Sequence, residues 1–582
     1  MKDYKRQGTI LKRKFFLFLL PNILSTIATS LNEFVDGILV AHLLGSDAMT
    51  LVNVGMPVML IFSMIYTFLG VGGAIIYAEY QGKLETKKAE KMFSITFTSS
   101  VIFAVIVMIL GLVFIYPLAG ILKAPPELYD VFIPYLRVLL ISGVLIIPIQ
   151  VVINFMPALG VPSYGAAINI IANVVNLVMD VVFIKYIGTG LKGASLATLT
   201  GYVVGAVVIV FMILLHKMDA PFTGLTAADL KQVPSIIARG SSPAVNQLGY
   251  CIKIAFCNNL SFNLAGLVGS TIFAVCMQTV SIASIMIGGI VQAMVPISAA
   301  LYGQRDYNGI RLLMKTVLRV QFISNLILLI IFELFPGLVL ALYKAEGLPQ
   351  DAAYAGIRIF SVMFVFRGFV LVYMYYFQVL SRKIYALIIS LIDGFVGIVP
   401  VALILAPIFG LNGMWLTFPV VSILLLSGII ITNLIIASRS EGKYKGVMLY
   451  ETEEADVPVY DVTFEADSSD ISQNTKKLED FCMYNDVRPE IAMFTAIAAE
   501  EMSVIIKETG KINKCDSIDM LVKIYKDDII LDLRSIGKPF DPSAYAKEQG
   551  SPLDTLMRIA SSVEFSYIMG MNQTRIVLKK NK

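Results

Sequence analysis

The sequence is poor in charged residues and in histidine. Asp, Glu, Lys and Arg make up 15% of its 582 residues, whereas an ordinary soluble domain carries about 25%. The two histidines, His42 and His216, cannot form a His-rich metal site. The chain is 57% hydrophobic and has a mean hydropathy of +0.77, so polar groups cannot cover its surface. We therefore expect lipid to be the solvent for most of the chain.

Cysteine pairs and nucleotide-binding loops are also missing. The five cysteines form no C-x-x-C motif and three lie in apolar segments, which favours reduced packing residues over disulfides or a metal site. No G-x-x-x-x-G-K-[ST] loop occurs, and this argues against a primary ATPase. The sequence predicts no enzyme activity, no cofactor and no nucleic-acid partner.

Apolar stretches long enough to cross a bilayer fill most of the chain before residue 440. A spanning helix needs about 20 mostly apolar residues. The basic N-terminus runs into the first stretch without a small-residue cleavage site, which indicates a span rather than a removed signal peptide. The predicted fold class is an all-α polytopic membrane protein with twelve transmembrane helices, at 15–41, 51–79, 93–118, 131–158, 164–186, 193–215, 241–262, 271–301, 317–343, 354–380, 385–408 and 412–438.

Lysine and arginine positions predict the orientation of these spans. If the N-terminus is inside, the predicted outer loops hold only Lys123, Lys185, Lys192 and Lys344. The inner loops hold the larger set, which runs from Lys83 to Lys383. This bias follows the positive-inside rule. It predicts a multi-pass protein of the cell inner membrane with both termini in the cytoplasm.

The two halves of the membrane region repeat. Gly45 and Gly82 lie 37 residues apart, as do Gly266 and Gly303, and each pair is offset from the other by 221 residues. Two six-helix bundles in the same order predict a parallel repeat with an axis along the membrane normal. The predicted domains are a basic cytoplasmic N-terminus (1–14), an N-lobe (15–216), a cytoplasmic linker (217–240), a C-lobe (241–438), a second linker (439–457) and a cytoplasmic domain (458–582).

The composition changes after residue 440, where acidic residues cluster and short alternating runs appear. Alternation of apolar and polar residues is typical of half-buried strands. Strands are predicted at 459–466, 519–525, 528–535, 564–569 and 573–579, and helices at 471–484, 489–508 and near 553–563. This pattern predicts a small α+β domain.

Several polar residues inside the first-lobe spans need an explanation, because a charge in hydrocarbon costs at least ~2.5–3.5 kcal/mol. The spacing of three and four residues places three of them on one helical face. Carboxylates, amide oxygens and a hydroxyl suit a proton or Na⁺, although a purely structural hydrogen-bonding role is the competing interpretation. The candidate coupling-ion residues are Glu33, Asp36, Asn173, Asn176, Asp180 and Thr198.

The second lobe carries a different candidate set for a substrate cavity. Lys253 either pairs with Asp393 or contacts an anionic substrate. The tyrosines either stack on flat cations or form an interfacial belt. The candidate substrate-cavity residues are Lys253, Arg367, Asp393, Tyr373, Tyr376 and Gln378.

Residues 10–440 resemble the multidrug and toxic compound extrusion (MATE) transporters. The matching segments are VDGILVAHLLGSDAM (35–49), GGAIIYAEYQGKLETKKAEK (72–91), NIIANVVNLVMDVVFIKYIGTGLKGASLAT (169–198) and GIVQAMVPISAALYGQRDYNGIR (289–311). The resemblance implies a V-shaped pair of six-helix bundles that alternates between outward-open and inward-open states. It also implies efflux of small organic compounds driven by H⁺ or Na⁺.

The residues of the family's first-lobe cation site are matched here by Asp36, Asn176, Asp180 and Thr198. Some members instead carry a carboxylate in the seventh span. Here that span reads NQLGYCIKIAFCNN, which contains Lys253 and no acidic residue. The resemblance therefore implies a cation site in the first lobe and leaves H⁺ and Na⁺ both open as the coupling ion.

The tail resembles a degenerate GHKL-type ATP-binding domain of the anti-sigma-kinase sort. FTAIAAEEMSVIIKE (494–508) is similar to the first ATP helix, with Glu500 or Glu501 as the acidic residue, and RSIGKPFDP (534–542), which contains Gly537, is similar to the adenine-binding segment. Val504 replaces the Mg²⁺-binding Asn and Ser535 replaces the adenine-binding Asp. These departures imply no kinase activity and no bound ATP. We expect a regulatory domain with a cytoplasmic partner.

The expected function is an antiporter that exports small organic, cationic or amphipathic compounds by alternating access. Two alternatives remain open from the sequence. One is a flippase for a lipid-linked or anionic substrate, which Lys253 and Arg367 would favour. The other is a membrane sensor that signals through the C-terminal domain.

Overall fold

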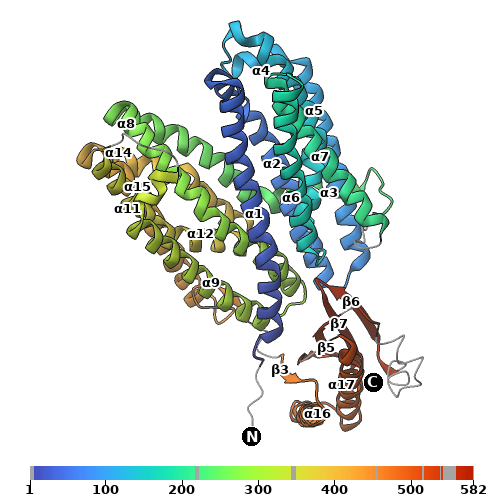
Figure 1. Cartoon of the computed structure of the whole chain (residues 1–582). Coiled ribbons are helices and arrows are strands. Elements are labelled where there is room, and N and C mark those ends of the chain that lie inside the picture. Colours follow the sequence, from blue (N-terminus) through green and yellow to red (C-terminus); the bar gives the residue numbers. More distant parts are fainter. Residues whose placement is uncertain are drawn as a thin grey trace.

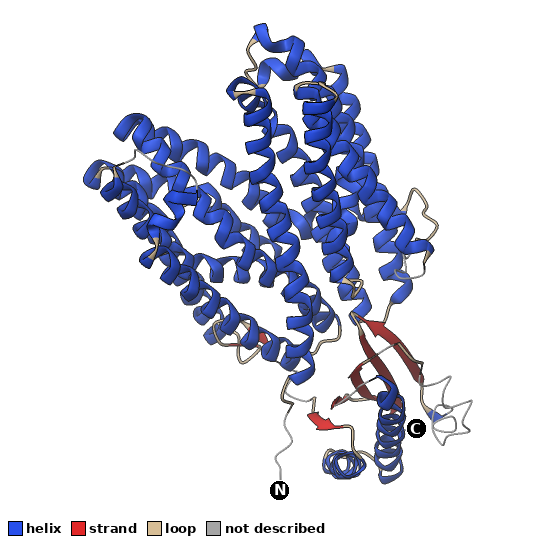
Figure 2. Ribbon diagram, in the orientation of Figure 1, coloured by secondary structure: helices blue, strands red, loops and turns tan. Residues whose placement is uncertain are grey.

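Two bundles of long helices form a V, and a small domain with a sheet lies at the end of the V that also holds the N-terminal segment (Figure 1). The computed structural model describes residues 6–215, 222–342, 349–452, 457–513, 517–537, 539–541 and 559–580. We call the end of the bundles that faces the small domain the domain side, and the opposite end the open side. Figure 2 shows that the bundles are helical and that the main sheet belongs to the small domain.

The N-lobe consists of six long helices and one short helix on the open side. Asp180 ends one helix, and a π-helical turn, η2 (Val181–Tyr186), prolongs it. The helices are α1 (Thr9–Leu44), α2 (Ser46–Gly82), α3 (Thr86–Val113), α4 (Ile115–Ile121), α5 (Tyr129–Phe155), α6 (Pro162–Asp180) and α7 (Leu191–Leu214).

The C-lobe follows the same plan with more breaks in its helices. A second π-helical turn, η4 (Ile392–Val396), interrupts one span. The helices are α8 (Val233–Gly303), α9 (Tyr307–Leu334), α10 (Pro336–Leu342), α11 (Gln350–Ser361), α12 (Met363–Val379), α13 (Lys383–Leu391), α14 (Ile398–Phe409) and α15 (Leu411–Arg439).

The prediction of twelve spans is confirmed once α8 is counted as two. Eleven stretches of the described residues are long and apolar enough to cross a membrane, and one of them is the 75-residue stretch Asp229–Gly303. At 1.5 Å per residue such a stretch would be more than three times as long as the ~30 Å hydrocarbon core. The helix breaks at Ala265 (φ −148°) and Gly266 (φ 60°), so it forms two spans.

The parallel repeat is visible in the backbone. Gly45 and Gly266, offset by 221 residues, both have a positive φ, 89° and 60°, which glycine adopts without steric cost. A helix follows each of them. The same offset relates the starts of α3 and α9, of α5 and α11, and of α6 and α13.

Element boundaries differ from the predicted ones where helices extend beyond the hydrocarbon. The linker predicted at 217–240 is shorter, because a 3-10 turn at Asp229–Gln232 leads directly into α8 at Val233. The first helix begins at Thr9 and not at residue 15. Hydropathy identifies the apolar centre of a span, whereas the basic ends of these helices keep helical backbone hydrogen bonds.

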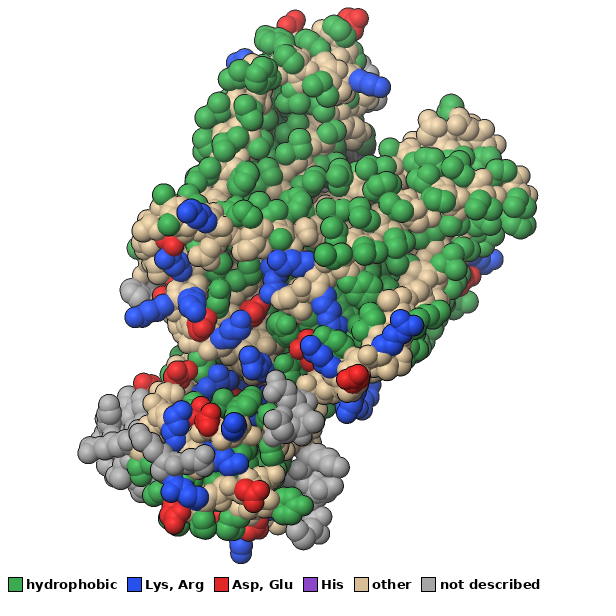
Figure 3. Space-filling model, turned by 180° about the vertical axis from the view of Figure 1, so that it is seen from behind, with side chains coloured by type: hydrophobic (Ala, Val, Ile, Leu, Met, Phe, Trp, Pro, Cys, Tyr) green, Lys and Arg blue, Asp and Glu red, His purple; other side chains and the backbone are tan. Residues whose placement is uncertain are grey.

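The outer surface of both bundles is apolar. Large hydrophobic side chains such as Leu110 (54% exposed), Val207 (61%) and Ile404 (61%) point outward along the spans. Figure 3 shows this apolar surface on both arms and shows Lys and Arg gathered towards the domain side. Exposed apolar area on this scale indicates contact with lipid.

The two lobes meet on the domain side through α2 and α8. A Cβ on Gly82 would lie 2.0 Å from the carbonyl oxygen of Ala300, and a Cβ on Gly303 would lie 2.1 Å from that of Glu79. Gly82 and Gly303 are equivalent positions of the repeat, so the contact follows the pseudo-two-fold axis. Only glycine permits the two backbones to approach this closely.

An ion pair between the lobes closes the same end. Arg239 of α8 donates from Nη2 to Glu79 Oε2 of α2 at 2.6 Å, and from Nη1 to the carbonyl oxygens of Gln378 and Val379 at 3.1 and 2.9 Å. The Gln378 side chain in turn donates to the carbonyl oxygen of Arg239. Glycine contacts and this ion pair therefore join three helices from both lobes.

The C-terminal domain is a two-layer α+β unit, as predicted. Its antiparallel sheet has the order β3-β4-β5-β7-β6. Two helices cover one face of the sheet and share an apolar core with it. The elements are β3 (Val459–Glu465), α16 (Ser468–Tyr484), α17 (Pro489–Asn513), β4 (Ser517–Ile524), β5 (Asp528–Ile536), β6 (Ser562–Ile568) and β7 (Met571–Lys579).

Two predicted segments of the tail differ from the structure. The linker predicted at 439–457 contains a hairpin, β1 (Tyr444–Lys445) and β2 (Tyr450–Glu451), held where Asn433 donates to the carbonyl oxygen of Val447 at 2.6 Å. The helix predicted near 553–563 lies largely outside the described residues, and its last two positions are strand β6. β6 pairs with β7 along its whole length, which overrides the local helical pattern.

The contact between α2 and α8 predicts a specific effect of Gly303→Ala. The added methyl group would overlap a backbone oxygen, and overpacking of this kind costs about 1–3 kcal/mol. We expect a lower unfolding midpoint, measured by the fluorescence of Trp415, which is 1% exposed in the C-lobe core. Gly428→Ala is the matched control, because a Cβ there has nothing within 4 Å. Equal midpoints for the two variants would contradict the packing argument.

Candidate functional site

The N-lobe brings two carboxylates together inside the membrane region. Asp36 lies in α1 and Asp180 ends α6, and their side chains face each other. Asp180 is fully buried and Asn176, one turn earlier in α6, is 7% exposed. The Tyr135 hydroxyl from α5 lies beside both carboxylates. Three helices thus supply the walls of an acidic site.

Polar atoms around these carboxylates lack partners within the described residues. Both carboxylate oxygens of Asp180 and the Nδ2 of Asn173 are buried without a hydrogen bond, while Asn176 Nδ2 donates to Thr198 Oγ1 at 3.4 Å. Buried polar groups normally have partners. The arrangement therefore fits a proton or a small cation bound between the acids. The side chain of Glu33, also predicted here, lies outside the described residues.

Local helix geometry contributes to the site. The backbone changes from α-helix to π-helix directly after Asp180, and Asp393 lies inside the π-helical turn η4 of the C-lobe, which is at a different position of the repeat. π-Helical turns widen the helix and are frequent at functional sites. Both buried aspartates thus lie where the normal backbone hydrogen-bond pattern is interrupted.

The C-lobe contains a buried cluster of mixed charge. Arg367 of α12 lies 3.4 Å from each Asp393 oxygen through Nε and Nη2. Asn246 Nδ2 donates to Asp393 Oδ2 at 3.0 Å, and Lys253 Nζ donates to the Asp393 carbonyl oxygen at 2.8 Å. Lys253, Arg367 and Asp393 are 3%, 8% and 5% exposed. The three predicted charges therefore form one cluster, in which Arg367 and not Lys253 faces the carboxylate.

Three residues predicted for the substrate cavity lie elsewhere. Tyr373 is 4% exposed, and Tyr376 and Gln378 are fully buried. Tyr376 packs against Tyr450 of the hairpin at 6.4 Å between ring centroids, and Gln378 belongs to the inter-lobe contact described above. Their neighbour Tyr375 is the residue that faces the cavity. Successive residues of a helix point in different directions, and the sequence does not fix which of them faces inward.

Two adjoining cavities lie between the lobes. Their volumes are about 240 and 470 Å³. The smaller one is lined by both lobes, including Asn22 and Tyr66 of the N-lobe, and the larger one reaches Arg367 in the C-lobe. The residues common to both linings are Pro243, Gln247, Val291, Gln292 and Tyr375. Asp36 and Asp180 are absent from both described linings.

The candidate nucleotide residues remain a prediction. Glu500 and Glu501 are half-buried in α17, and Gly537 follows β5. The Gly537 carbonyl oxygen accepts a hydrogen bond from the Tyr567 hydroxyl at 3.0 Å. Within the described residues, these positions lie on the helix and at the end of the central strand and do not form a phosphate site. Residues 542–558 lie outside the described ranges.

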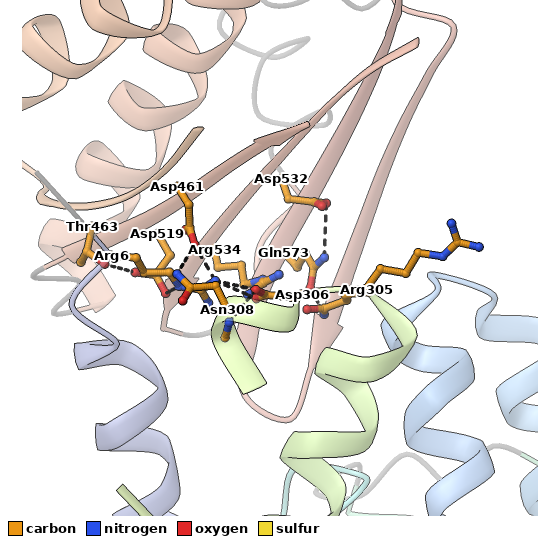
Figure 4. A network of polar contacts seen from close by, with 12 residues as sticks. Arg6, Arg305, Asp306, Asn308, Asp461, Thr463, Asp519, Asp532, Arg534 and Gln573 are labelled. Carbon is orange, nitrogen blue, oxygen red and sulfur yellow. Dashed lines mark hydrogen bonds and ion pairs between the residues drawn. The ribbon is translucent and has the colours of Figure 1, made fainter. Parts of the chain in front are cut away.

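A buried charge network joins the C-terminal domain to the membrane region (Figure 4). Asp306, between α8 and α9, accepts hydrogen bonds from Arg6 at 2.8 Å and from Arg534 of β5 at 2.5 Å. Arg6 also lies 3.4 Å from Asp519 and 3.6 Å from Asp461. Burial opposes ionisation of Asp306, but Arg6 and Arg534 lower the pKa of this carboxyl below its ordinary value.

Sequence reasoning missed this network. In the sequence, its basic members resemble ordinary positive-inside charges. Asp306 resembles a helix N-cap, and it does cap α9, because its side chain accepts a hydrogen bond from Gly309 N at 2.8 Å. A usable signal lay in the polar positions of β4 and β5. There Asp519 and Arg534 alternate with core residues. The face of the sheet opposite α16 and α17 is therefore polar, and its side chains need polar partners when that face is buried.

These features define a class of protein. Two six-helix bundles related by a parallel repeat, with a cavity between them and an acidic site in one bundle, are an architecture found in membrane transporters. Comparison with known proteins gives the same class. The family model described as MatE matches residues 21–182, which confirms the predicted resemblance to MATE transporters.

Individual relatives extend the match over both lobes. The chain is 20% identical to the probable multidrug resistance protein YoeA of Bacillus subtilis, over 60% of this chain and 76% of that protein. It is 20% identical to the multidrug export protein MepA of Staphylococcus aureus, over 68% of this chain and 87% of that protein. An outward-facing structure of a multidrug resistance MATE family transporter of the MOP superfamily matches with a TM-score of 0.68 and 22% identity, over 74% of this chain and 97% of that one. The fold of the membrane region is therefore the MATE fold.

The C-lobe cluster predicts that Asp393→Asn is strongly destabilising. Without the carboxylate, two buried cations would lack a counter-charge, and breaking a buried pair in this way costs about 3–5 kcal/mol. We expect a clear drop in the unfolding midpoint followed by Trp415 fluorescence. Asp351→Asn removes an exposed carboxylate of the same lobe and should leave the midpoint unchanged. A small or equal effect of both would show that Asp393 does not neutralise the cluster.

Proposed function

We propose that this protein is a secondary transporter that exports small organic compounds, driven by entry of H⁺ or Na⁺. The observation that carries the proposal is the Asp36–Asp180 pair, which has no lysine or arginine partner within the described residues. Two adjacent carboxylates in a low-dielectric interior do not both stay ionised unless a proton or a cation joins them. The pair can therefore exist in a loaded and an empty state.

Ion binding can drive transport because the site spans several helices. Asp36 belongs to α1, and Asn176 and Asp180 belong to α6. A bound ion would draw these helices together, whereas an empty site would favour their separation. A ligand shifts a conformational equilibrium only by its difference in affinity for the two states, and such a site supplies that difference.

The structure corresponds to an outward-open state if the domain side is cytoplasmic. The basic residues gathered at that end support this orientation through the positive-inside rule, and a bacterial inner membrane is the proposed location. In this state Gly82, Gly303 and the Arg239–Glu79 pair seal the cytoplasmic end. Substrate uptake from the cytoplasm then requires the seal to open.

The acidic pair predicts that Asp36→Asn and Asp180→Asn abolish gradient-driven efflux. Each amide removes the charge that would hold the ion while preserving the shape of the side chain. Efflux should be measured in loaded cells with cationic, neutral and anionic fluorescent dyes, while the pH and Na⁺ gradients are varied separately. We expect at least a tenfold fall in the initial rate, on the order of 1.4 kcal/mol in coupling.

The matched control is Asp130→Asn, which removes an exposed carboxylate at the start of α5. It should transport like the unchanged protein. Wild-type rates in both site variants would refute the mechanism. A protein that moves no dye under either gradient would refute the exporter itself.

We further propose that the C-terminal domain regulates the cycle by clamping the cytoplasmic ends of both lobes. It binds the C-lobe through Asp306 and through Lys523 Nζ, which donates to the Arg305 carbonyl oxygen at 2.7 Å. It also touches the N-lobe, because a Cβ on Gly160 would lie 2.7 Å from the Cα of Met569. A clamp that holds both lobes opposes the separation that an inward-open state needs.

A polar cleft offers a place from which a partner could release the clamp. It has a volume of about 940 Å³ and lies between the turns of the membrane region and the sheet. Its lining includes Lys83, Glu85 and Arg305 on one side and Lys523, Asp528 and Arg575 on the other. A cytoplasmic partner that binds here would compete with the contacts between domain and lobes.

The clamp predicts that Arg534→Met frees the domain. The change leaves Asp306 with one cationic partner in place of two, and removal of one member of a buried pair costs about 3–5 kcal/mol. We expect faster proteolysis between residues 439 and 457 and a higher initial efflux rate. Asp527→Asn, an exposed change in the same domain, should alter neither. A released domain with an unchanged or slower rate would contradict a restraining role.

A further inference from the structure

The C-lobe buries more positive than negative charge. Lys253 and Arg367 share one carboxylate, that of Asp393. Both contacts from Arg367 to this carboxylate are long, at 3.4 Å. The cluster therefore keeps a surplus positive charge in a medium where charge is costly. A cluster whose only task was to join helices would be more stable with matched charges.

One side chain of the cluster exposes this positive charge to the cavity. Arg367 lines the cavity of about 470 Å³, whereas Lys253 and Asp393 lie behind it. Among the described residues that line the two cavities, Arg367 is the one with a formal charge. Asp393 faces Nε and Nη2 of the guanidinium, and Tyr250 lies near the same side chain, so a ligand in the cavity would approach through Nη1.

The rest of the lining suits an amphipathic molecule. Tyr250 and Tyr375 supply aromatic surface and Gln292 supplies an amide group, whereas Gln247 Nε2 donates to Ser63 Oγ at 2.8 Å. The apolar part includes Val280, Ile287, Leu371 and Met374. A volume of about 470 Å³ falls in the usual range for small-molecule sites, about 300–1,000 Å³. The cavity thus has one cationic end and an otherwise mixed surface.

We propose that this cavity selects small amphipathic organic anions, whose carboxylate, sulfonate or phosphate group binds Arg367. The inference rests on the proposed export function and names the substrate class. Lys253 and Asp393 act as positioning residues. Asp393 holds the guanidinium in place, and Lys253 keeps the cluster positive. This proposal keeps the amphipathic character expected from the sequence, which was for cationic or amphipathic compounds, and assigns the substrate a negative charge.

The two lobes then bind opposite charges. Asp36 and Asp180 give the N-lobe an excess of negative charge, and Arg367 with Lys253 gives the C-lobe an excess of positive charge. A coupling cation and an organic anion would not compete for the same carboxylate.

The test uses three derivatives of one fluorophore that differ in charge. Dansylglycine carries a carboxylate, its methyl ester is neutral, and dansyl-ethylenediamine carries an ammonium group. Binding to the full-length protein in lipid nanodiscs should be measured by the change in dansyl fluorescence. We expect the carboxylate probe to bind at least tenfold more tightly than its ester, since a hydrogen bond to a charged group contributes about 1.5–3 kcal/mol.

Substitutions connect this preference to one side chain. Arg367→Gln should weaken binding of dansylglycine about tenfold or more and leave the ester unchanged, whereas Arg367→Lys should retain part of the preference. The matched control is Arg358→Gln, which removes an exposed arginine of the same lobe. Arg367→Gln leaves Lys253 and Asp393 with matched charges. Arg367→Gln combined with Asp393→Asn restores one positive charge, that of Lys253, so the double variant tests whether the preference depends on the Arg367 side chain or only on the net charge of the cluster.

The outcomes separate this inference from the export function. Equal affinity for dansylglycine and its ester, or an unchanged preference in folded Arg367→Gln and double-variant protein, would overturn the anion site. Gradient-driven efflux of ethidium but not of anionic dyes would overturn it too, while leaving the exporter in place. Loss of anion preference in both variants with intact Trp415 unfolding curves would support it.

Discussion

The close approach of α2 and α8 on the domain side is the contact on which the rest of the molecule depends. Gly82 and Gly303 allow the two backbones to meet, and Arg239 and Glu79 close the same end with an ion pair. Above this point the lobes diverge, which creates the cavities between them. Below it the turns present Asp306 to the C-terminal domain. Gly82 and Gly303, which the repeat relates to each other, thus lie at the point from which both the cleft and the docking surface extend.

Because the interior of the lobes has a low dielectric constant, a charge there that lacks a partner is costly. In the N-lobe, Asp36 and Asp180 face each other without a basic partner among the described residues, whereas in the C-lobe Asp393 serves both Arg367 and Lys253. Each arrangement leaves a charge that a bound species of opposite sign would balance. The two lobes share the same backbone path, but the N-lobe carries an unbalanced negative charge and the C-lobe an unbalanced positive charge.

The sheet of the C-terminal domain has one apolar and one polar face, and each face packs against a different part of the molecule. Its apolar face is covered by α16 and α17, and its polar face packs on the membrane region through Arg534 and Asp519. Burial raises the pKa of Asp461 in this interface to about 6, against the opposing effect of Arg6. The interface is therefore held by charges that are buried and mutually dependent, and Ile568 and Met569 add apolar contacts with the membrane region.

The sequence alone determined the membrane class, the twelve spans, the repeat and the acidic residues of the N-lobe, because hydropathy, glycine spacing and in-span charges are local signals. It placed Tyr373, Tyr376 and Gln378 in a cavity, where the structure puts them in the interior and in the inter-lobe seal. Only the tertiary structure decided which face of α12 points inward and which of two cations faces Asp393. It also showed that Arg6, Asp306 and Arg534 meet. Those outcomes depend on the rotation and packing of helices far apart in the chain, which no local pattern encodes.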